Sequence, residues 1–224
     1  MKSQFLLDPN ITFLNHGSFG ACPKPIFEEY QRLQLELENE PVYFIQKKQA
    51  EYLKIAKERL AKYIGCNAND FFFTPNPTFA INTIMRSLNL VAGDEILTTN
   101  QEYGAMDRTW NFYCKKSGAK YIRQNISLPV VSKEQILEEF WSGYTSKTKI
   151  VFLNQISSAT ALIFPVKEIC DKARELGLIT IIDGAHVAGQ MDLDITELNP
   201  DFYTGTLHKW MLAPKGSSFL YVKK

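Results

Sequence analysis

Helical patterning fills most of the first 65 residues. Apolar residues recur at three- and four-residue steps over residues 26–38 and again over residues 44–64, with charged residues between them. This spacing predicts two amphipathic helices. Gly65 follows the second pattern, where it is a suitable C-terminal cap. Ahead of the helices, residues 11–25 predict a short extended piece that breaks into a loop at its glycines and prolines.

Beyond residue 65 the pattern changes to short apolar runs that alternate with helical stretches. Predicted strands cover residues 70–74, 95–99, 120–124, 149–154, 178–182, 202–204 and 217–222, and predicted helices cover residues 78–90, 104–116, 133–141 and 166–176. This alternation indicates an open, mostly parallel seven-stranded α/β sheet with helices on both faces. No internal repeat or low-complexity linker interrupts it. The predicted division is therefore an N-terminal loop and helices, 1–65, followed by one large domain, 66–224.

Composition narrows the possible partners. The chain has 224 residues, 45% of them hydrophobic, which is enough for a sizeable core. Its formal net charge of +1 gives no field of one sign, so neither nucleic acid nor a membrane is expected as a partner. No apolar run approaches the length of a bilayer span or a signal peptide. The four cysteines are scattered, which suits a reducing compartment, and we expect a cytoplasmic protein.

Two polar loops follow the first two predicted strands, at the sheet edge where α/β proteins bind ligands. A turn containing Asn76, Pro77 and Thr78 runs into a helix, where free N–H groups and the helix dipole suit a phosphate. An ordinary helix capped by Asn76 or Thr78 is the alternative. Tyr103 follows the second strand and places an aromatic ring at the same edge, although it could equally be a packing residue.

Later strands bring ionisable groups to this edge. Asp183 and His186 follow the fifth predicted strand, and Thr206, His208 and Lys209 follow the sixth. A lone lysine is usually solvated. A lysine that is desolvated at the end of a buried strand can instead become a nucleophile and form a Schiff base.

The three histidines of the chain all fall in predicted loops rather than on helix faces. They are His16, His186 and His208. Such clustering favours a functional site over packing. A zinc site is the competing interpretation, but the chain has no HExxH helix, and zinc would leave the nearby Asp and Lys unexplained. A nucleotide site lacks its glycine motifs, because neither a Walker loop nor GxGxxG is present. We therefore expect no metal.

One cofactor would use all four loops. Pyridoxal 5'-phosphate (PLP) needs a helix N-terminus and hydroxyl groups for its phosphate, and an aromatic ring to stack on. It also needs a carboxylate for its pyridine nitrogen and a lysine amine for its aldehyde. The sequence thus predicts a PLP site.

Several multi-residue motifs occur in one order along the chain: residues 13–23 (FLNHGSFGACP), 102–105 (EYGA), 183–186 (DGAH), 208–210 (HKW) and 213–216 (APKG). In these the chain resembles the fold-type I PLP-dependent enzymes of aminotransferase class V, and among them the isopenicillin N epimerase-like branch. The resemblance covers nearly the whole chain. It implies the large domain of the aspartate aminotransferase-like PLP-dependent transferase fold.

The resemblance also implies roles for individual residues. Lys209 would form the internal aldimine, Asp183 would pair with the pyridinium, and Tyr103 would stack on the ring. His186 would lie near the phenolic oxygen. We expect Lys209, His186 and Tyr103 to be the catalytic residues, with Tyr103 as the candidate proton donor, since a residue stacked on the ring would face away from Lys209. Thr78, Thr206 and His208 would hold the phosphate. We also expect Asn76 and Pro77 to line the cofactor site, and His16, Gly17 and Ser18 to contact the substrate.

The chain departs from the family in two respects. Pro77 stands where the family often has a free N–H, so the phosphate would rely more on Thr78. The resemblance implies a longer protein, and we expect this chain to lack the C-terminal small domain that helps to bind substrate.

The fold and cofactor leave the reaction open. Our first interpretation is an isopenicillin N epimerase-like or aminotransferase enzyme that acts on an amino acid and forms a homodimer. A C–S lyase or cysteine desulfurase-like enzyme is an alternative. A truncated non-catalytic remnant or dimerisation module is another, as is a binding module for a different phosphate ligand.

Overall fold

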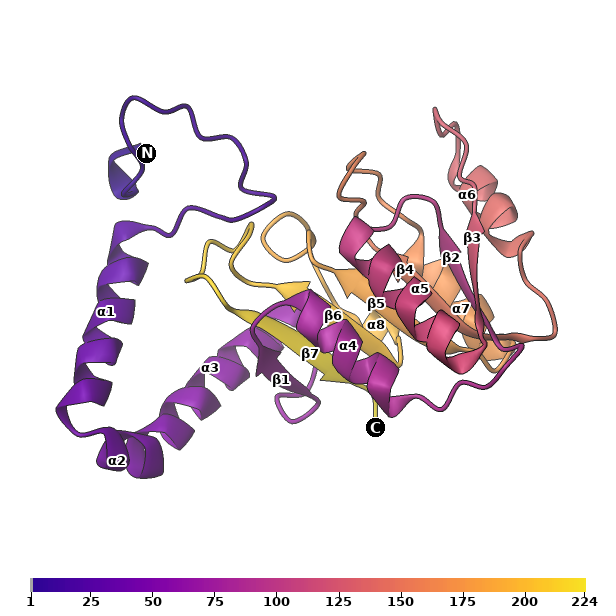
Figure 1. Ribbon diagram of the computed structural model, residues 1–224. Coiled ribbons are helices and arrows are strands. Elements are labelled where there is room, and N and C mark those ends of the chain that lie inside the picture. The colour runs from indigo at the N-terminus through magenta and orange to yellow at the C-terminus, as the bar shows by residue number, and fades with distance from the viewer. Residues whose placement is uncertain (1) are drawn as a thin grey trace.

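One sheet organises the chain. The computed structural model describes residues 2–224, and within them seven strands lie in the order β1-β7-β6-β5-β4-β2-β3 (Figure 1). The strands are β1 (Phe71–Thr74), β2 (Glu95–Thr99), β3 (Lys120–Gln124), β4 (Thr148–Asn154), β5 (Ile179–Gly184), β6 (Phe202–Thr206) and β7 (Ser218–Val222). Adjacent strands from β3 to β6 pair in parallel, whereas β7 is antiparallel to both β6 and β1. The predicted seven-stranded, mostly parallel sheet is confirmed.

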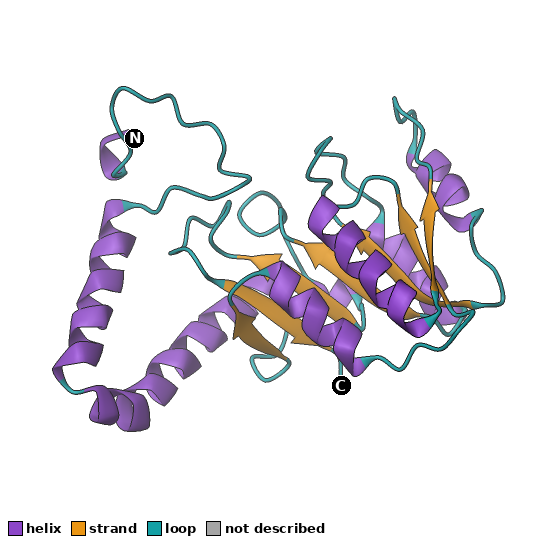
Figure 2. Cartoon of the chain, in the orientation of Figure 1, coloured by secondary structure: helices purple, strands orange, loops and turns teal. Residues whose placement is uncertain are grey.

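Helices cover both faces of the sheet, as expected (Figure 2). On one face lie α4 (Pro77–Ser87) and α5 (Gly104–Ser117), and on the other lie α6 (Lys133–Trp141), α7 (Val166–Glu175) and the short α8 (Ile195–Leu198).

Strand β4 shows why both faces must be covered. Ile150 and Phe152 pack under α4 and α5, while Val151 and Leu153 pack toward α6 and α7, and all four are fully buried. Successive side chains of a strand point to opposite faces, so an unbroken apolar run requires a core on each side.

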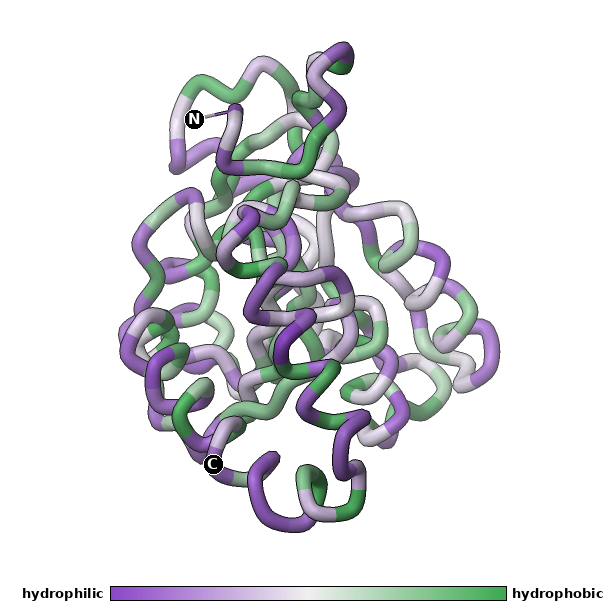
Figure 3. Tube along the Cα trace, turned by 90° about the vertical axis from the view of Figure 1, so that its left-hand side faces the viewer, coloured by the Kyte–Doolittle hydropathy of each residue, from purple (hydrophilic) through white to green (hydrophobic). Residues whose placement is uncertain are grey.

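The N-terminal segment extends away from the sheet. It contains η1 (Lys2–Gln4), α1 (Lys24–Asn39), α2 (Pro41–Tyr43), a π-helical turn η2 (Phe44–Lys48) and α3 (Gln49–Ile64). Helix α1 has no buried residue, and only the end of α3 reaches the core (Figure 1). Figure 3 views the molecule from the left-hand side of Figure 1, and hydrophobic and hydrophilic stretches alternate along the protruding helices there. Gly65 caps α3 in the left-handed conformation, with φ 64°.

Small differences from the expected boundaries have local causes. The helix expected at 78–90 ends at Ser87, because Leu88 adopts an extended backbone and its N–H bonds back to Ile84. The stretch expected as one helix at 44–64 begins with the π-helical turn. No helix within residues 2–224 is both long and apolar enough to cross a bilayer. The division at residue 65 remains a prediction.

Candidate active site

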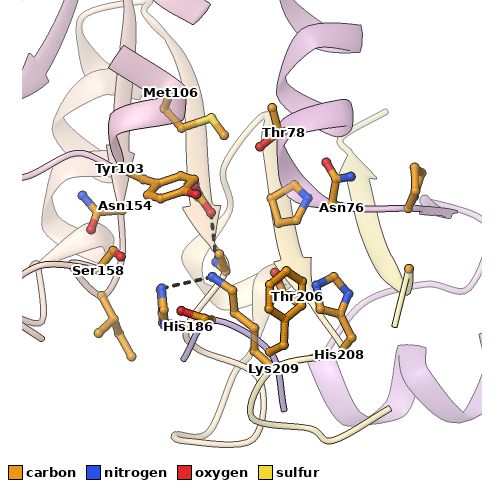
Figure 4. A pocket seen from close by; sticks show the side chains of 18 residues that line it. Asn76, Thr78, Tyr103, Met106, Asn154, Ser158, His186, Thr206, His208 and Lys209 are labelled. Carbon is orange, nitrogen blue, oxygen red and sulfur yellow. Dashed lines mark hydrogen bonds between the residues drawn. The ribbon is translucent and has the colours of Figure 1, made fainter. Parts of the chain in front are cut away.

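A cavity of about 320 Å³ opens at the carboxyl ends of the strands, a size typical of small-molecule sites. Its walls come from the N-terminal loop and from the ends of β1, β2, β4, β5 and β6. Figure 4 shows Thr78, Asn76, Thr206 and His208 on one side in that view, and Asn154, Ser158 and His186 on the other. The sequence-predicted residues on its walls are Ser18, Asn76, Pro77, Thr78, Tyr103, Asp183, His186, Thr206, His208 and Lys209.

Lys209 lies in the middle of this cavity and is only partly exposed. Its Nζ is 3.2 Å from Nε2 of His186 and 6.0 Å from the centroid of the Tyr103 ring. Burial lowers the pKa of Lys209, since a charged amine loses hydration there, while the Asp183 carboxylate opposes this effect. The amine is therefore closer to its nucleophilic form than a surface lysine would be.

Asp183 is buried at the end of β5, where it is in register with Asn154 of β4 and Thr204 of β6. Its Oδ1 accepts the N–H of Ala185 at 2.9 Å. Burial raises its pKa, and the Ala185 N–H and Lys209 lower it in part. A carboxyl group in this position fits a protonated ring nitrogen as its partner.

The opposite end of the cavity offers groups that suit a phosphate. Asn76 caps α4, with its Oδ1 accepting the Phe79 N–H at 2.8 Å, so the capped-helix alternative also describes this turn. Thr78 is the second residue of that helix, where an N–H has no intrahelical acceptor. The Thr206 hydroxyl is buried and has no hydrogen-bond partner. An orphaned buried hydroxyl on a cavity wall fits a site for an oxygen-rich ligand.

His208 completes that end of the cavity. Its Nδ1 lies 2.8 Å from the Ser217 carbonyl oxygen, so the Nδ1–H donates to that oxygen. Burial lowers the pKa of His208, and the Ser217 bond opposes this. The Phe19 ring stacks on the imidazole at 5.9 Å. Pro77 lies buried at the first position of α4 and has no N–H to donate.

Only part of the N-terminal loop reaches the cavity. Ser18 lines the cavity, and Gly17 packs against the rings of Trp210 and His186. His16 does not line this cavity. Its Nδ1 accepts the Ala21 N–H at 3.3 Å, and its ring packs edge-on against Phe13. Substrate contacts by these loop residues remain predictions.

A second cavity of about 390 Å³ lies beyond His186. It shares Ser18, Ile156, Ser158 and His186 with the first. The rest of its lining is Asn15, Gly17, Ser157, Ala161, Ile163, Gln190, Met191 and Trp210. His186 thus lies at the boundary between the two cavities.

Other residues of the site were not assigned roles from the sequence. Asn154 and Ser158 line the cavity, but no motif marks them. Glu102 is buried, with its carboxylate accepting the Thr99 hydroxyl at 2.7 Å and the Asn154 N–H at 2.9 Å. Burial raises the pKa of Glu102 to about 8. The only sequence signal for Glu102 was its place in the motif at 102–105.

No group of three or more His, Cys, Asp or Glu side chains among residues 2–224 is arranged to hold a metal ion. The polar groups that line the cavity include the hydroxyls of Thr78 and Thr206, the Lys209 amine and the Asp183 carboxyl group.

Proteins of similar sequence match almost the whole length of this chain. Isopenicillin N epimerase of Amycolatopsis lactamdurans is 34% identical over 98% of this chain and 56% of its own length. A probable chloroplastic L-cysteine desulfhydrase of Arabidopsis thaliana is 26% identical over 97% of this chain and 49% of its own length. The chain therefore spans about half the length of these curated relatives.

Solved structures share the fold. The cystine C-S lyase C-DES, in complex with cysteine persulfide, superimposes with a TM-score of 0.85 at 24% identity, over 96% of this chain and 58% of that one. The Escherichia coli cysteine desulfurase CsdA gives a TM-score of 0.80 at 24% identity, over 99% and 56%. The expected PLP-dependent transferase fold is thereby confirmed.

The family model "Aminotransferase class-V" matches residues 22–224, which include every strand, the lysine at 209 and the acid at 183. Together with the epimerase relatives, this match bears out the resemblance seen in the motifs. The chain belongs to the aminotransferase class-V family.

Proposed function

We propose that the protein binds PLP through Lys209 and acts on an amino acid or a similar amine, most like isopenicillin N epimerase. One observation carries the proposal. The partly buried Lys209 amine shares a cavity with the buried Asp183 carboxyl group and the Tyr103 ring. The class-V family and the epimerase relatives support the same cofactor.

Each residue of the cavity has a task in this proposal. Thr78, Thr206 and His208 hold the phosphate, and Asp183 keeps a proton on the ring nitrogen. Tyr103 packs against the ring face. When bound, PLP supplies an electron-withdrawing ring that stabilises negative charge on the substrate carbon beside the amino group.

Proton transfer at that carbon falls to two groups on opposite sides. Lys209 Nζ takes the Cα proton as a general base, since burial lowers its pKa toward the working range. Tyr103 is the proposed donor on the other face; it is 49% exposed, so its hydroxyl can exchange protons with water. Return of a proton to the opposite face inverts the carbon centre, which is the change an epimerase makes.

A C–S lyase is the second candidate. It is favoured by the fold shared with C-DES and by the cysteine desulfhydrase relatives. The two candidates use the same base and differ in what leaves the substrate. Incubation of the PLP-loaded protein with L-cysteine and with other L-amino acids separates them, because a lyase releases sulfide while an epimerase yields the D-amino acid.

Cofactor attachment is the first test. The purified chain is mixed with PLP, treated with borohydride and digested, and the modified peptide is identified by mass spectrometry. We expect visible absorbance and a pyridoxyl mass on Lys209. Lys209→Ala should abolish both, whereas Lys147→Ala, at an exposed lysine, should change neither.

Absence of a lysine-dependent band would overturn the proposal. It would leave a non-catalytic remnant of the fold, or a module for another phosphate ligand, as the remaining explanation. A band without turnover of any amino acid would favour cofactor binding without catalysis by this stretch of chain.

We also propose that the protein forms a homodimer in the cytoplasm. The exposed apolar side chains of the protruding N-terminal segment, such as Val42, Tyr43 and Ile45, suit an interface, and the four cysteines are free. Light scattering on the purified chain measures the mass directly. A monomer at micromolar concentration would contradict the dimer.

A further inference from the structure

His186 lies between two nitrogen atoms of the segment that follows β6. Trp210 Nε1 is 3.1 Å from His186 Nδ1. Lys209 Nζ is 3.2 Å from His186 Nε2, as Figure 4 shows. The imidazole therefore has a hydrogen-bond partner at each ring nitrogen. Both partners, Lys209 and Trp210, belong to the HKW motif at residues 208–210.

The direction of these two hydrogen bonds follows from the chemistry of the groups. An indole N–H can only donate, so Nδ1 of His186 must be the acceptor and carries no proton. A neutral imidazole has one N–H, which is then on Nε2 and points to Lys209. That N–H needs an acceptor, and a lysine nitrogen has a lone pair only when it is uncharged.

We infer that Trp210 is a positioning residue that fixes the Nε2–H tautomer of His186 and thereby holds Lys209 as a free amine. An ammonium at Lys209 would set its N–H groups against the Nε2–H. The tautomer that an ammonium needs, with its proton on Nδ1, would set that proton against the indole N–H. A doubly protonated His186 meets the same conflict at Trp210.

The other groups around Lys209 act in the opposite direction. The Asp183 carboxyl, when ionised, and the face of the Tyr103 ring both attract a cation. His208, on the same loop, has its pKa lowered by burial and adds no negative charge. Burial lowers the pKa of Lys209, and the Asp183 carboxylate opposes that shift. The Trp210 hydrogen bond adds a directional preference for the free amine to the general effect of burial.

Packing holds the two rings in this arrangement. A Cβ at Gly17 would lie 3.2 Å from Cζ2 of Trp210 and 3.6 Å from Cε1 of His186. A side chain at position 17 would therefore crowd both rings. The Gln190 amide also donates to the His186 carbonyl oxygen at 2.6 Å. These contacts keep His186 where Trp210 can reach it.

The consequence for chemistry rests on the proposed function. Attack on a cofactor aldehyde needs the lone pair of the lysine nitrogen, and an ammonium has none. Trp210 would thus keep the nucleophile ready at a pH where a free lysine is protonated.

The tautomer can be read without any cofactor. Long-range ¹H–¹⁵N correlation spectra of the full chain, labelled with ¹⁵N-histidine, distinguish bare from protonated ring nitrogens, and only three histidines contribute. His186→Gln identifies the signals of residue 186. We expect a bare Nδ1 and a protonated Nε2 at neutral pH. A proton on Nδ1, or on both nitrogens, would overturn the inference.

A second measurement follows the lysine itself. Trp210→Phe keeps a flat apolar ring and removes the N–H, and we expect PLP to attach to Lys209 about five-fold more slowly at neutral pH. The rate should recover as pH rises, because only the amine population changes. Trp141→Phe is the matched control, since its indole N–H is buried on α6 without a partner. An unchanged rate–pH profile in Trp210→Phe would contradict the inference.

The two proposals fail in different ways. If no PLP attaches to Lys209, the proposed function fails, while the spectra still decide the tautomer. If PLP attaches but His186 carries its proton on Nδ1, the proposed function stands and the role of Trp210 is wrong.

Discussion

Glu102 gives the sharpest test of the electrostatics beneath the site. Its carboxylate bridges the ends of β2 and β4, where it accepts the Thr99 hydroxyl and the Asn154 N–H. The β2–β4 ladder ends at Leu97 and Val151, so this side chain satisfies a backbone N–H that no strand partner reaches. The position is fully buried, and burial raises the pKa of Glu102 from its ordinary value of 4.5 to about 8.

That shift makes stability depend on pH in a known direction. Between pH 4.5 and about 8 the folded protein holds a proton on Glu102 that the unfolded chain has released. The stabilisation from this group is therefore complete below pH 4.5 and is lost as pH rises through 8. At about 1.4 kcal/mol per pH unit, the interval amounts to roughly 5 kcal/mol in the free energy of unfolding.

Glu102→Gln should remove this dependence and keep the bridge. The amide oxygen can accept the Asn154 N–H, and the amide N–H can donate to the Thr99 hydroxyl, which has a second lone pair beyond the one that accepts the Gln101 N–H. We expect the variant to gain stability relative to the wild type by up to about 1.4 kcal/mol for each pH unit from 5 to 8.

Urea denaturation of both proteins at several pH values measures the difference. Shifted groups that do not act on Glu102, such as His186 and His208, are common to both proteins and cancel when one curve is subtracted from the other. The Asp183 charge raises the pKa of Glu102 and so remains part of the measured difference. Glu138→Gln, at an exposed position on α6, is the control and should show no such trend. A difference between Glu102→Gln and wild type that stays constant from pH 5 to 8 would refute the reasoning.

Two further predictions concern the cavity walls, and a third concerns the packing of Gly184 against Tyr203. Thr206→Val removes the buried orphan hydroxyl, so the free energy of unfolding should change by less than about 1 kcal/mol while PLP affinity, followed by absorbance, falls; a strong loss of stability would contradict this role. His208 should take up a proton when PLP or inorganic phosphate binds, because burial lowers its pKa and its Nδ1–H already donates to the Ser217 carbonyl oxygen. Calorimetry in buffers of different ionisation enthalpy counts the protons taken up, and His208→Gln should abolish this uptake. Gly184→Ala would bring a Cβ within 2.1 Å of the Tyr203 hydroxyl, which is buried and hydrogen-bonded, and should cost about 1–3 kcal/mol by thermal unfolding; wild-type stability in that variant would contradict the packing.

Secondary structure was predictable where a local pattern fixes it. The helix at 133–141 has the expected bounds, because Ser132 accepts the Gln135 N–H as an N-cap and Ile136 and Phe140 face the core. The π-helical turn was not predictable, since apolar spacing across residues 44–64 continues through Phe44–Lys48 without a break. Helix α8, at Ile195–Leu198, is too short to show a period.

The position of the site was predictable because strand ends converge. Asp183 and Lys209 each follow or close a buried strand, and in a mostly parallel sheet such positions share one edge. The links of Glu102 to Asn154 and of Trp210 to His186 span 52 and 24 residues. They depend on which loop reaches which, and no sequence period encodes that.

Burial shifts the ionisable groups of the site in a consistent way. It lowers the pKa of Lys209 and His208 and raises the pKa of Asp183 and Glu102, so every one of these groups moves toward its neutral form. Folding alone therefore disfavours charge on these groups relative to the same groups in water. An anionic phosphate and a protonated ring nitrogen favour the opposite, charged forms of His208 and Asp183. Cofactor binding would therefore favour charges that folding disfavours, so cofactor affinity should change with pH as His208 and Asp183 titrate.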